Sequence, residues 1–162
     1  MALEVDFFWH EMQSPDDLDR NIDAAVDALT AALRADSTRV WNPWTLGAAR
    51  GEFRQRLRAA CRGELVPVDQ VAGIGDGRPP LFEIRWQNIN VVRAASDGHV
   101  HEQALLRLIH GEPEWAYRVV ALHAHEKVVL TTDEQTHAAQ DAEIELAARR
   151  YILGEPSHWG RK

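Results

Sequence analysis

Apolar residues recur along the first third of the chain in two different periods. Near the N-terminus they occupy every second position: Leu3, Val5, Phe7 and Trp9. This period of two predicts a half-buried strand. Between residues 15 and 34 the apolar positions lie three or four apart, which predicts an amphipathic helix. Ser14 and Pro15 suit its start, because serine caps free N–H groups and proline tolerates the first helical position.

A second helix is predicted from about Leu46 to Arg62, after Pro43 interrupts the pattern at Asn42. Its polar faces carry the densest positive charge in the chain, on Arg50, Arg54, Arg56, Arg58 and Arg62. This charge is typical of a solvated face that pairs with the acidic first helix. It is also the one cluster on that part of the chain where an anion could bind.

The middle of the chain changes from loop to sheet. Residues 63–80 are interpreted as a plain loop, because no Gly-Lys-Ser/Thr follows the glycines at 73, 75 and 77. After Pro80 the pattern predicts a strand, its hairpin partner, a turn, a short helix and a long strand, at residues 81–86, 89–93, 97–98, 101–110 and 115–125. Residues 127–130 either extend the last strand or pair beside it.

The last predicted element is a helix from about Glu134 to Ile152, which Gly154 and Pro156 end. The order of elements predicts a single α+β domain over residues 1–162. We expect a helical hairpin near the N-terminus and a C-terminal helix, packed around an antiparallel, twisted sheet of about four strands.

Composition narrows the class of protein. The chain has 162 residues, 45% hydrophobic and 27% charged, as in one globular domain. It lacks a basic secretory signal and any apolar run near the roughly 20 residues of a membrane span, and its single Cys61 can form no internal disulfide. We therefore expect a cytoplasmic protein that binds no membrane. The formal charge of −7 disfavours a general nucleic-acid binder, whose phosphate contacts need lysine and arginine.

Three short motifs occur in order in the second half of the chain: Leu81-Phe-Glu-Ile-Arg85, Leu122-His-Ala-His-Glu-Lys127 and Ala142-Glu-Ile-Glu-Leu-Ala-Ala-Arg-Arg150. Together they resemble the RelE/HigB toxin superfamily, above all its phage-derived HigB-like branch. In that branch a strand ending in Glu-Leu-Arg meets a strand ending in Leu-His-Ala-Phe-x-Lys-Lys, and a helix beginning Glu-Ile-x-x-Ala follows. The resemblance covers about residues 81–152 and implies a RelE-like fold, with residues 94–114 as an insertion between two strands.

This resemblance implies a toxin of a toxin–antitoxin system, an endoribonuclease that cleaves messenger RNA on the ribosome and is restrained by a small antitoxin protein. The RNA 2′-hydroxyl attacks the adjacent phosphate, so the site needs cations and groups that move protons. Arg85 and Lys127 would supply the positive charge, and His123 would transfer a proton or hold a phosphate. Three further residues would bind the substrate: Arg93, Arg118 and His125. For Arg118 the alternative is a strand arginine paired with a carboxylate, and no cofactor is implied.

The chain also departs from the motifs of the family. Val128 replaces the second lysine, His125 replaces the aromatic residue, and residues 128–141 add acidic side chains. Because these changes weaken the attraction for an anion, a second hypothesis is a non-catalytic protein of phage or mobile-element origin that binds and inhibits a host protein. Trp41 and Trp44, in a loop that contains a proline, suit such a contact.

Paired histidines suggest a third hypothesis, a metal hydrolase. In His99-Val-His101 and in His123-Ala-His125, strand alternation would place both imidazoles of a pair on one face, a spacing used in metal sites. No cysteine ligand and no closing spacing accompany them. We therefore expect no bound metal, and we interpret these histidines as surface or hydrogen-bonded strand residues.

Overall fold

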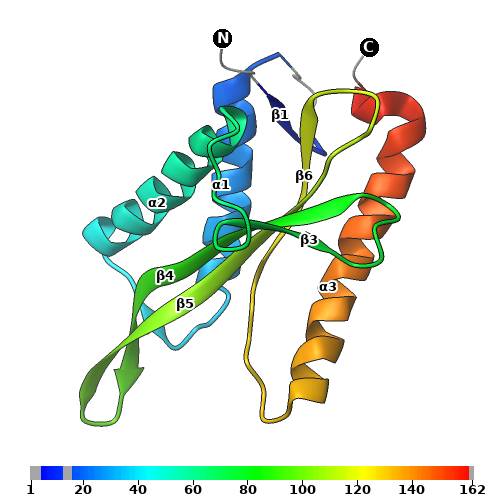
Figure 1. Cartoon of the computed structure of the whole chain (residues 1–162). Coiled ribbons are helices and arrows are strands. Elements are labelled where there is room, and N and C mark those ends of the chain that lie inside the picture. Colours follow the sequence, from blue (N-terminus) through cyan, green and yellow to red (C-terminus); the bar gives the residue numbers. More distant parts are fainter. Residues whose placement is uncertain (1–4, 13–15, 161–162) are drawn as a thin grey trace.

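The computed structural model describes residues 5–12 and 16–160. In this part of the chain three α-helices, a short 3-10 helix and an open, twisted sheet of six strands form an α+β fold (Figure 1). The strands are β1 (Asp6–Trp9), β2 (Arg39–Val40), β3 (Val71–Ile74), β4 (Leu81–Ala95), β5 (Gly98–Gly111) and β6 (Arg118–Glu126). The helices are α1 (Leu18–Arg34), α2 (Pro43–Cys61), α3 (Asp133–Gly154) and the 3-10 helix η1 (Glu155–Gly160).

The sheet is mixed, with the strand order β1-β6-β5-β4-β2 and with β3 also paired to β4. β1 lies parallel to β6, with Asp6 opposite Arg118, whereas the other strand pairs are antiparallel. The predicted α+β class, the helical hairpin and the C-terminal helix are confirmed. The prediction of an antiparallel sheet of about four strands is wrong, both in the number of strands and in the direction of β1.

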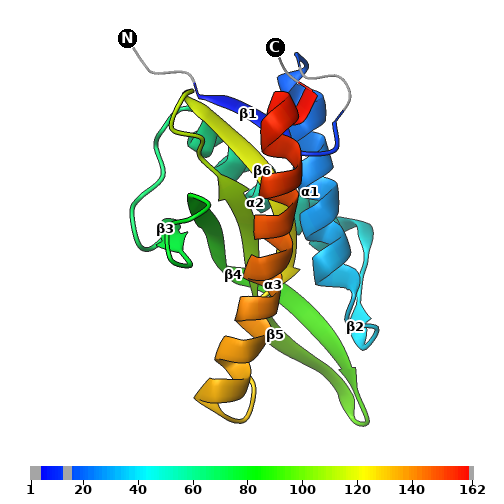
Figure 2. The ribbon, with the colours of Figure 1, turned by 90° about the vertical axis from the view of Figure 1, so that its right-hand side faces the viewer.

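Helices cover both faces of this sheet (Figures 1 and 2). Successive residues of a strand point to opposite faces, so neighbours in sequence join different cores. Leu108 packs in the larger core with α1 and α2, and Ile109 packs in the smaller core with α3. Val119 and Val120 divide in the same way. The sheet therefore has an α1–α2 face and an α3 face.

Opposite charges join α1 to α2. Three arginines spaced four residues apart on α2 meet three aspartates on α1, in the pairs Arg50–Asp27 (2.8 Å), Arg54–Asp23 (2.8 Å) and Arg58–Asp19 (2.7 Å). The numbering falls on one helix as it rises on the other, as expected of an antiparallel hairpin. The predicted pairing with the acidic first helix is confirmed for these arginines, so they are not a free anion-binding cluster.

The long hairpin of β4 and β5 overturns two predictions. Residues 81–86 and 89–93 belong to one strand, β4, in which the register shifts between Trp86 and Ile89. The partner strand β5 includes residues 101–110, which were predicted to be a helix. Residues 106–110 are all buried, because helices and loops cover both faces of the sheet there, and the alternation of a half-exposed strand is lost. The turn predicted at Asp97 is confirmed.

The helix starts also differ from the prediction. α1 begins at Leu18, and its N-cap is Asp17, whose carboxylate accepts a hydrogen bond from the backbone N–H of Arg20. The predicted start at Ser14 and Pro15 lies outside the described residues. α2 begins at Pro43 rather than at Leu46, because Asn42 is extended and caps the helix while proline occupies its first turn.

Two further segments depart from the prediction. Residues 63–80 are not a plain loop, since residues 71–74 form β3 on the edge of β4. Residues 127–130 neither extend β6 nor pair beside it, apart from one bond that the Lys127 N–H donates to the carbonyl of Leu105 at 2.7 Å. They form instead the loop that leads from the sheet to α3.

α3, with 22 residues, is long but mostly exposed. Its buried side chains, Ala147 and Tyr151, lie in the C-terminal half, and the N-terminal half diverges from the β4–β5 hairpin (Figure 2). Within the described ranges, no helix has both the length and the apolar character needed to cross a membrane.

Candidate functional site

A row of polar side chains crosses the α3 face of the sheet. Arg85 of β4 lies opposite Arg107 of β5, and Arg107 lies opposite His125 of β6. Because residues i and i+2 of a strand share a face, Glu83 and His123 lie beside the two ends of this row. We call these five residues the polar row. Three adjacent strands thus place ionisable groups where a buried sheet would ordinarily carry apolar residues.

Glu83 holds the two arginines of the row. Its side chain is only 2% exposed, and its Oε1 lies 2.8 Å from Nε of Arg85 and 3.7 Å from Nε of Arg107. Arg107 also donates through Nη1 to the carbonyl oxygens of Trp86 and Leu106. Burial lowers the pKa of Arg107, although Glu83 opposes this shift. A guanidinium keeps its charge even so, which makes the row a buried cluster of charges.

His123 has both ring nitrogens engaged. Arg150 of α3 donates Nη1–H to Nδ1 of His123, and Glu143 of the same helix contacts Nε2. Arginine has no acceptor, so Nδ1 must carry the lone pair, and Nε2 therefore carries the proton and donates it to the carboxylate. α3 thus fixes both the orientation and the tautomer of this imidazole.

His125 has one ring nitrogen free. Its Nδ1–H donates to the carbonyl oxygen of Glu126 at 3.4 Å, so Nε2 carries the lone pair. That Nε2 is buried, and no described residue donates to it. Burial lowers the pKa of His125 below its usual 6.5, more than the carboxylate of Glu143 raises it. At neutral pH this imidazole is therefore an uncharged base with an unoccupied acceptor nitrogen.

The two histidines lie in a groove along the free edge of β6. The groove has a volume of about 680 Å³, between the end of α1, the loop after β6 and α3. His123, His125 and Lys127 line it together, and the rings of the two histidines stack at 5.7 Å with an interplanar angle of 7°. No ion pair to another described residue holds the half-buried Lys127 ammonium. Base and cation thus line one groove, the base from β6 and the cation from the first residue of the loop that follows it.

Acidic residues of the groove are mostly neutralised by arginines. Arg39 holds Glu126 through two hydrogen bonds of 2.7 and 2.5 Å. Arg93 also donates two hydrogen bonds to Glu102, from Nε at 3.0 Å and from Nη2 at 2.6 Å, both to the same carboxylate oxygen. Glu143 is occupied by His123. The two arginine pairs reduce the repulsion that an approaching phosphate would otherwise meet, whereas the uncharged His123 leaves the charge of Glu143 in place.

The structure brings only part of the predicted site together. His123, His125 and Lys127 share the groove, whereas Arg85 lies two strands away on the same face, bonded to Glu83 and to the carbonyl of Val68. Convergence of Arg85, His123 and Lys127 on one open hollow is therefore not seen. Arg93 reaches the groove only through Glu102.

Arg118 lies at the other end of β6. Its Nε is 3.0 Å from Asp6, and its guanidinium lies over the rings of Phe8 and Trp115. The alternative of a strand arginine paired with a carboxylate is thus the observed arrangement. Arg118 and His125 lie at opposite ends of β6, too far apart to contact the same nucleotide. Only a longer substrate could contact both residues.

Sequence reasoning missed Arg107, Glu83, Glu143 and Arg150 as members of the site. Arg107 fell in the segment predicted to be a helix, so its row on the sheet could not be recognised. The signal that could have found it is Glu83-x-Arg85, two charges on one face of a strand that must be covered. Such charges need buried partners on the neighbouring strand.

The other paired histidines do not line this groove. His99 and His101 are exposed near the tip of the β4–β5 hairpin. Among the described residues, no group of three histidine, cysteine, aspartate or glutamate side chains is arranged to hold a metal ion. Trp44 is 86% exposed, as predicted, whereas Trp41 is half-buried and packs against the larger core.

Comparison with family models, curated proteins and solved structures found no match. The likeness to RelE/HigB toxins thus depends on the three motifs described above.

Proposed function

We propose that the chain is a RelE/HigB-like toxin, an endoribonuclease in which His125 is the general base and Lys127 the cation that faces the phosphate. The observation that supports this assignment is that a neutral His125 lines the same groove as Lys127: no described residue occupies Nε2 of His125, and none forms an ion pair with the Lys127 ammonium. A base whose lone pair is free can accept a proton without first breaking a bond to the protein. The proposed partners are messenger RNA on the ribosome and a cognate antitoxin.

The proposed reaction begins with transfer of the RNA 2′-hydroxyl proton to Nε2 of His125. The 2′-oxygen then attacks the adjacent phosphorus, and Lys127 stabilises the negative charge that develops on the phosphoryl oxygens. The bond from phosphorus to the 5′-oxygen breaks, and the leaving oxygen takes a proton from the Lys127 ammonium. The products are a 2′,3′-cyclic phosphate and a 5′-hydroxyl.

His123 is a positioning residue in this proposal, although the family motif would assign it to proton transfer. Both of its nitrogens are occupied by α3, so it stacks beside His125 and keeps the groove in shape. Arg107 lies opposite His125 in the sheet and has an Nε without a hydrogen-bond partner among the described residues. Burial is the main cause that lowers the pKa of His125 and so keeps its ring uncharged in the resting state.

The experiment that tests this function is cleavage of messenger RNA on translating ribosomes, read by primer extension. His125→Gln is expected to lower the cleavage rate by about 10²–10⁴-fold, the usual contribution of a general base. Lys127→Met is expected to lower it as well, whereas His99→Gln, at the exposed hairpin tip, is the matched control and should leave it unchanged. Full cleavage by both His125→Gln and Lys127→Met would refute the assignment.

A second candidate is a non-catalytic protein that binds and inhibits a host protein. It is favoured by apolar side chains left in solvent, above all Trp44 at 86% exposure and Leu153 at 81%. The double variant His125→Gln/Lys127→Met separates the two candidates in a growth assay. Growth inhibition that survives this variant and is lost in Trp44→Ala would support binding.

A further inference from the structure

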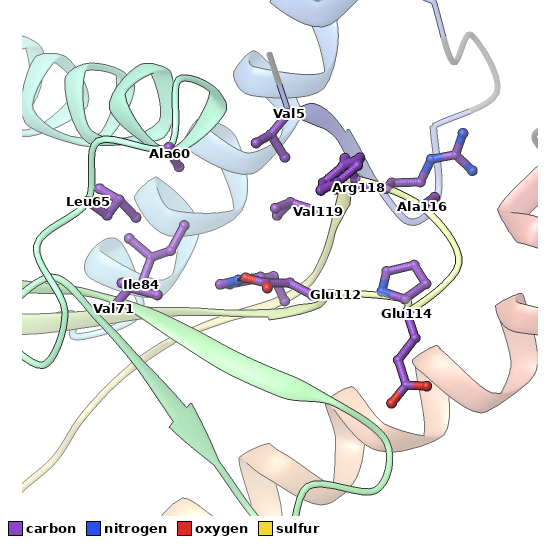
Figure 3. Close-up of a pocket in the computed structure, with 14 residues that line it drawn as sticks. Val5, Ala60, Leu65, Val71, Ile84, Glu112, Glu114, Ala116, Arg118 and Val119 are labelled. Atoms are coloured by element: carbon purple, nitrogen blue, oxygen red, sulfur yellow. Dashed lines mark hydrogen bonds and ion pairs between the residues drawn. The ribbon is translucent and has the colours of Figure 1, made fainter. Parts of the chain in front are cut away.

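Exposed apolar side chains lie on the outer side of α3, away from the sheet. Leu146, Ile152 and Leu153 are all exposed there, Leu153 to 81%. Apolar side chains elsewhere in the fold close on one another, and those that line a cavity of about 390 Å³ at the end of α2 converge on its interior (Figure 3). The outer side of α3 has no such cover, since this helix lies in front of the sheet in Figure 2 and no described element lies over it.

The outer apolar side chains follow one line along the helix. Ala138, Ala142, Leu146 and Leu153 are separated by four, four and seven residues, so they lie on one side of α3, opposite the buried Ala147. All four are exposed. We call these four residues, together with Ile152, the outer face. A helix that is apolar on two sides can bury only one of them against its own sheet, which leaves the second for a partner.

The size of the side chains changes along the outer face. Its alanines lie in the N-terminal half of α3, and its leucines and Ile152 lie in the C-terminal half. An antiparallel copy of α3 would place the large side chains of each helix against the small ones of the other, and both helices could then approach closely. A parallel copy would place leucine against leucine and leave a space between the alanines. Size therefore favours an antiparallel copy.

Charge changes along α3 in the same direction. Residues 133–143 contain four acidic side chains and no lysine or arginine, a net charge of −4 with histidine neutral. Residues 144–154 contain one acidic side chain, Glu145, and two basic ones, Arg149 and Arg150, a net charge of +1. An antiparallel copy would place the acidic half of each helix beside the positive half of the other, whereas a parallel copy would bring two acidic halves together.

We propose that the outer face binds a second copy of this chain, with the two α3 helices antiparallel about a twofold axis near residue 145. Leu153 of each copy then faces Ala138 of the other. The face is complementary to itself in size and in charge, as a twofold interface requires. Glu143, the residue of α3 that lines the groove, is not on the outer face, so the groove stays open and the dimer does not depend on the proposed ribonuclease activity.

The test is sedimentation equilibrium of the whole chain. We expect a monomer–dimer equilibrium with a dissociation constant of about 10 µM, because a contact one helix wide is at the small end of stable interfaces. Leu153→Asp should raise this constant about 30-fold or more, since both copies lose a large apolar contact. Trp44→Asp is the matched control, at an equally exposed apolar residue of α2, and should leave the constant unchanged. A monomer at every concentration up to about 300 µM, or a dimer lost in Trp44→Asp and kept in Leu153→Asp, would overturn the proposal.

The orientation of the helices is tested by the distance between two spin labels. Asp133 is exposed at the start of α3, so Asp133→Cys can be labelled while the native Cys61 is buried. In the antiparallel dimer the two labels lie about twelve residues on either side of the axis, about 35 Å apart at 1.5 Å per residue. In a parallel dimer they would lie about 10–20 Å apart, near the spacing of packed helices. A distance below about 25 Å would overturn the antiparallel arrangement.

Discussion

The two faces of the sheet are built from different chemistry. On the α1–α2 face, residues such as Phe53, Leu57 and Trp86 are almost completely buried and make a continuous apolar core. On the α3 face the apolar core is smaller, and beside it the ionisable side chains of Glu83, Arg107 and His125 are buried on three neighbouring strands.

This difference indicates that the two faces of the sheet have different roles, one in stability and one in function. A face that only had to hold the fold together would carry apolar side chains, because paired buried charges rarely stabilise more than a well-packed core. The α3 face carries buried charged side chains instead, next to an open groove. We infer that the α1–α2 face carries most of the stability and that the α3 face is arranged for binding or chemistry.

The largest effect is expected on the α1–α2 face. Phe53 is 0% exposed and meets Trp86 edge to face at 5.5 Å. Phe53→Ala should lower the free energy of unfolding by about 4 kcal/mol, because it leaves a cavity as well as removing apolar contacts. Urea denaturation measures this. A loss below about 1 kcal/mol would mean that the two faces contribute alike.

The buried charges of the α3 face are expected to give the next largest effect. Glu83→Leu leaves Arg107 unpaired in the interior and should cost about 3 kcal/mol in unfolding free energy. The double variant Glu83→Leu/Arg107→Met removes both charges and should recover most of this loss. In the matched control Glu102→Leu, the partner Arg93 is 41% exposed and the cost should stay below about 1 kcal/mol. A double variant no more stable than Glu83→Leu would contradict the pairing.

Acid sensitivity is expected to come from His10, whose ring is 10% exposed. Burial, with Arg150 nearby, lowers the pKa of His10 from 6.5 to about 4. Below pH 6.5 His10 binds a proton in the unfolded chain, whereas in the folded chain it binds one only near pH 4. The free energy of unfolding therefore falls as the pH is lowered over this interval. Relative to His10→Gln, the unchanged protein should lose about 2–3 kcal/mol more between pH 7 and pH 4.5. Parallel urea titrations at the two pH values measure the difference, and equal losses would exclude His10 as the cause.

The smallest effect is expected from the ion pairs between α1 and α2. Arg54 is 38% exposed and its partner Asp23 is 55% exposed. Water screens such a pair, so Arg54→Ala should change the free energy of unfolding by less than about 0.5 kcal/mol. A thermal unfolding curve at low and at high salt measures it. A loss above about 2 kcal/mol would show that charge, and not the apolar core, holds the hairpin.

Elements with a clear period could be predicted from the sequence. The helices near residues 15–34 and 134–152 were recognised within a few residues, because the first has an apolar face, the second has apolar residues at helical spacing in its C-terminal half, and their ends carry helix signals. The strand β5 could not be recognised, since Ala104, Leu105, Leu108 and Ile109 fit helical spacing equally well. Only its position in the middle of a covered sheet explains why both sides of the strand are buried.

The candidate site was predicted in part, because a regular spacing of residues also places side chains on a common face of a strand. His123 and His125 lie on one predicted strand, so alternation alone places them on one face. Lys127 was predicted either to extend that strand or to pair beside it, and it lies instead in the loop after β6. The role of each histidine depends instead on what its nitrogens meet, and those partners come from α3 and from the strand's own backbone. No spacing in the sequence reveals that His123 is occupied and His125 is free.

The parallel pairing of β1 with β6 has a consequence for synthesis. The contact between Asp6 and Arg118 joins positions 112 residues apart, so the first strand emerges long before its neighbour exists. At the usual speed of translation this delay is on the order of ten seconds. During that time Phe7 and Phe8, almost fully buried in the finished fold, are accessible to chaperones and proteases. A nascent chain that stops before residue 118 would lack this strand pairing and could not complete the burial of the two phenylalanines.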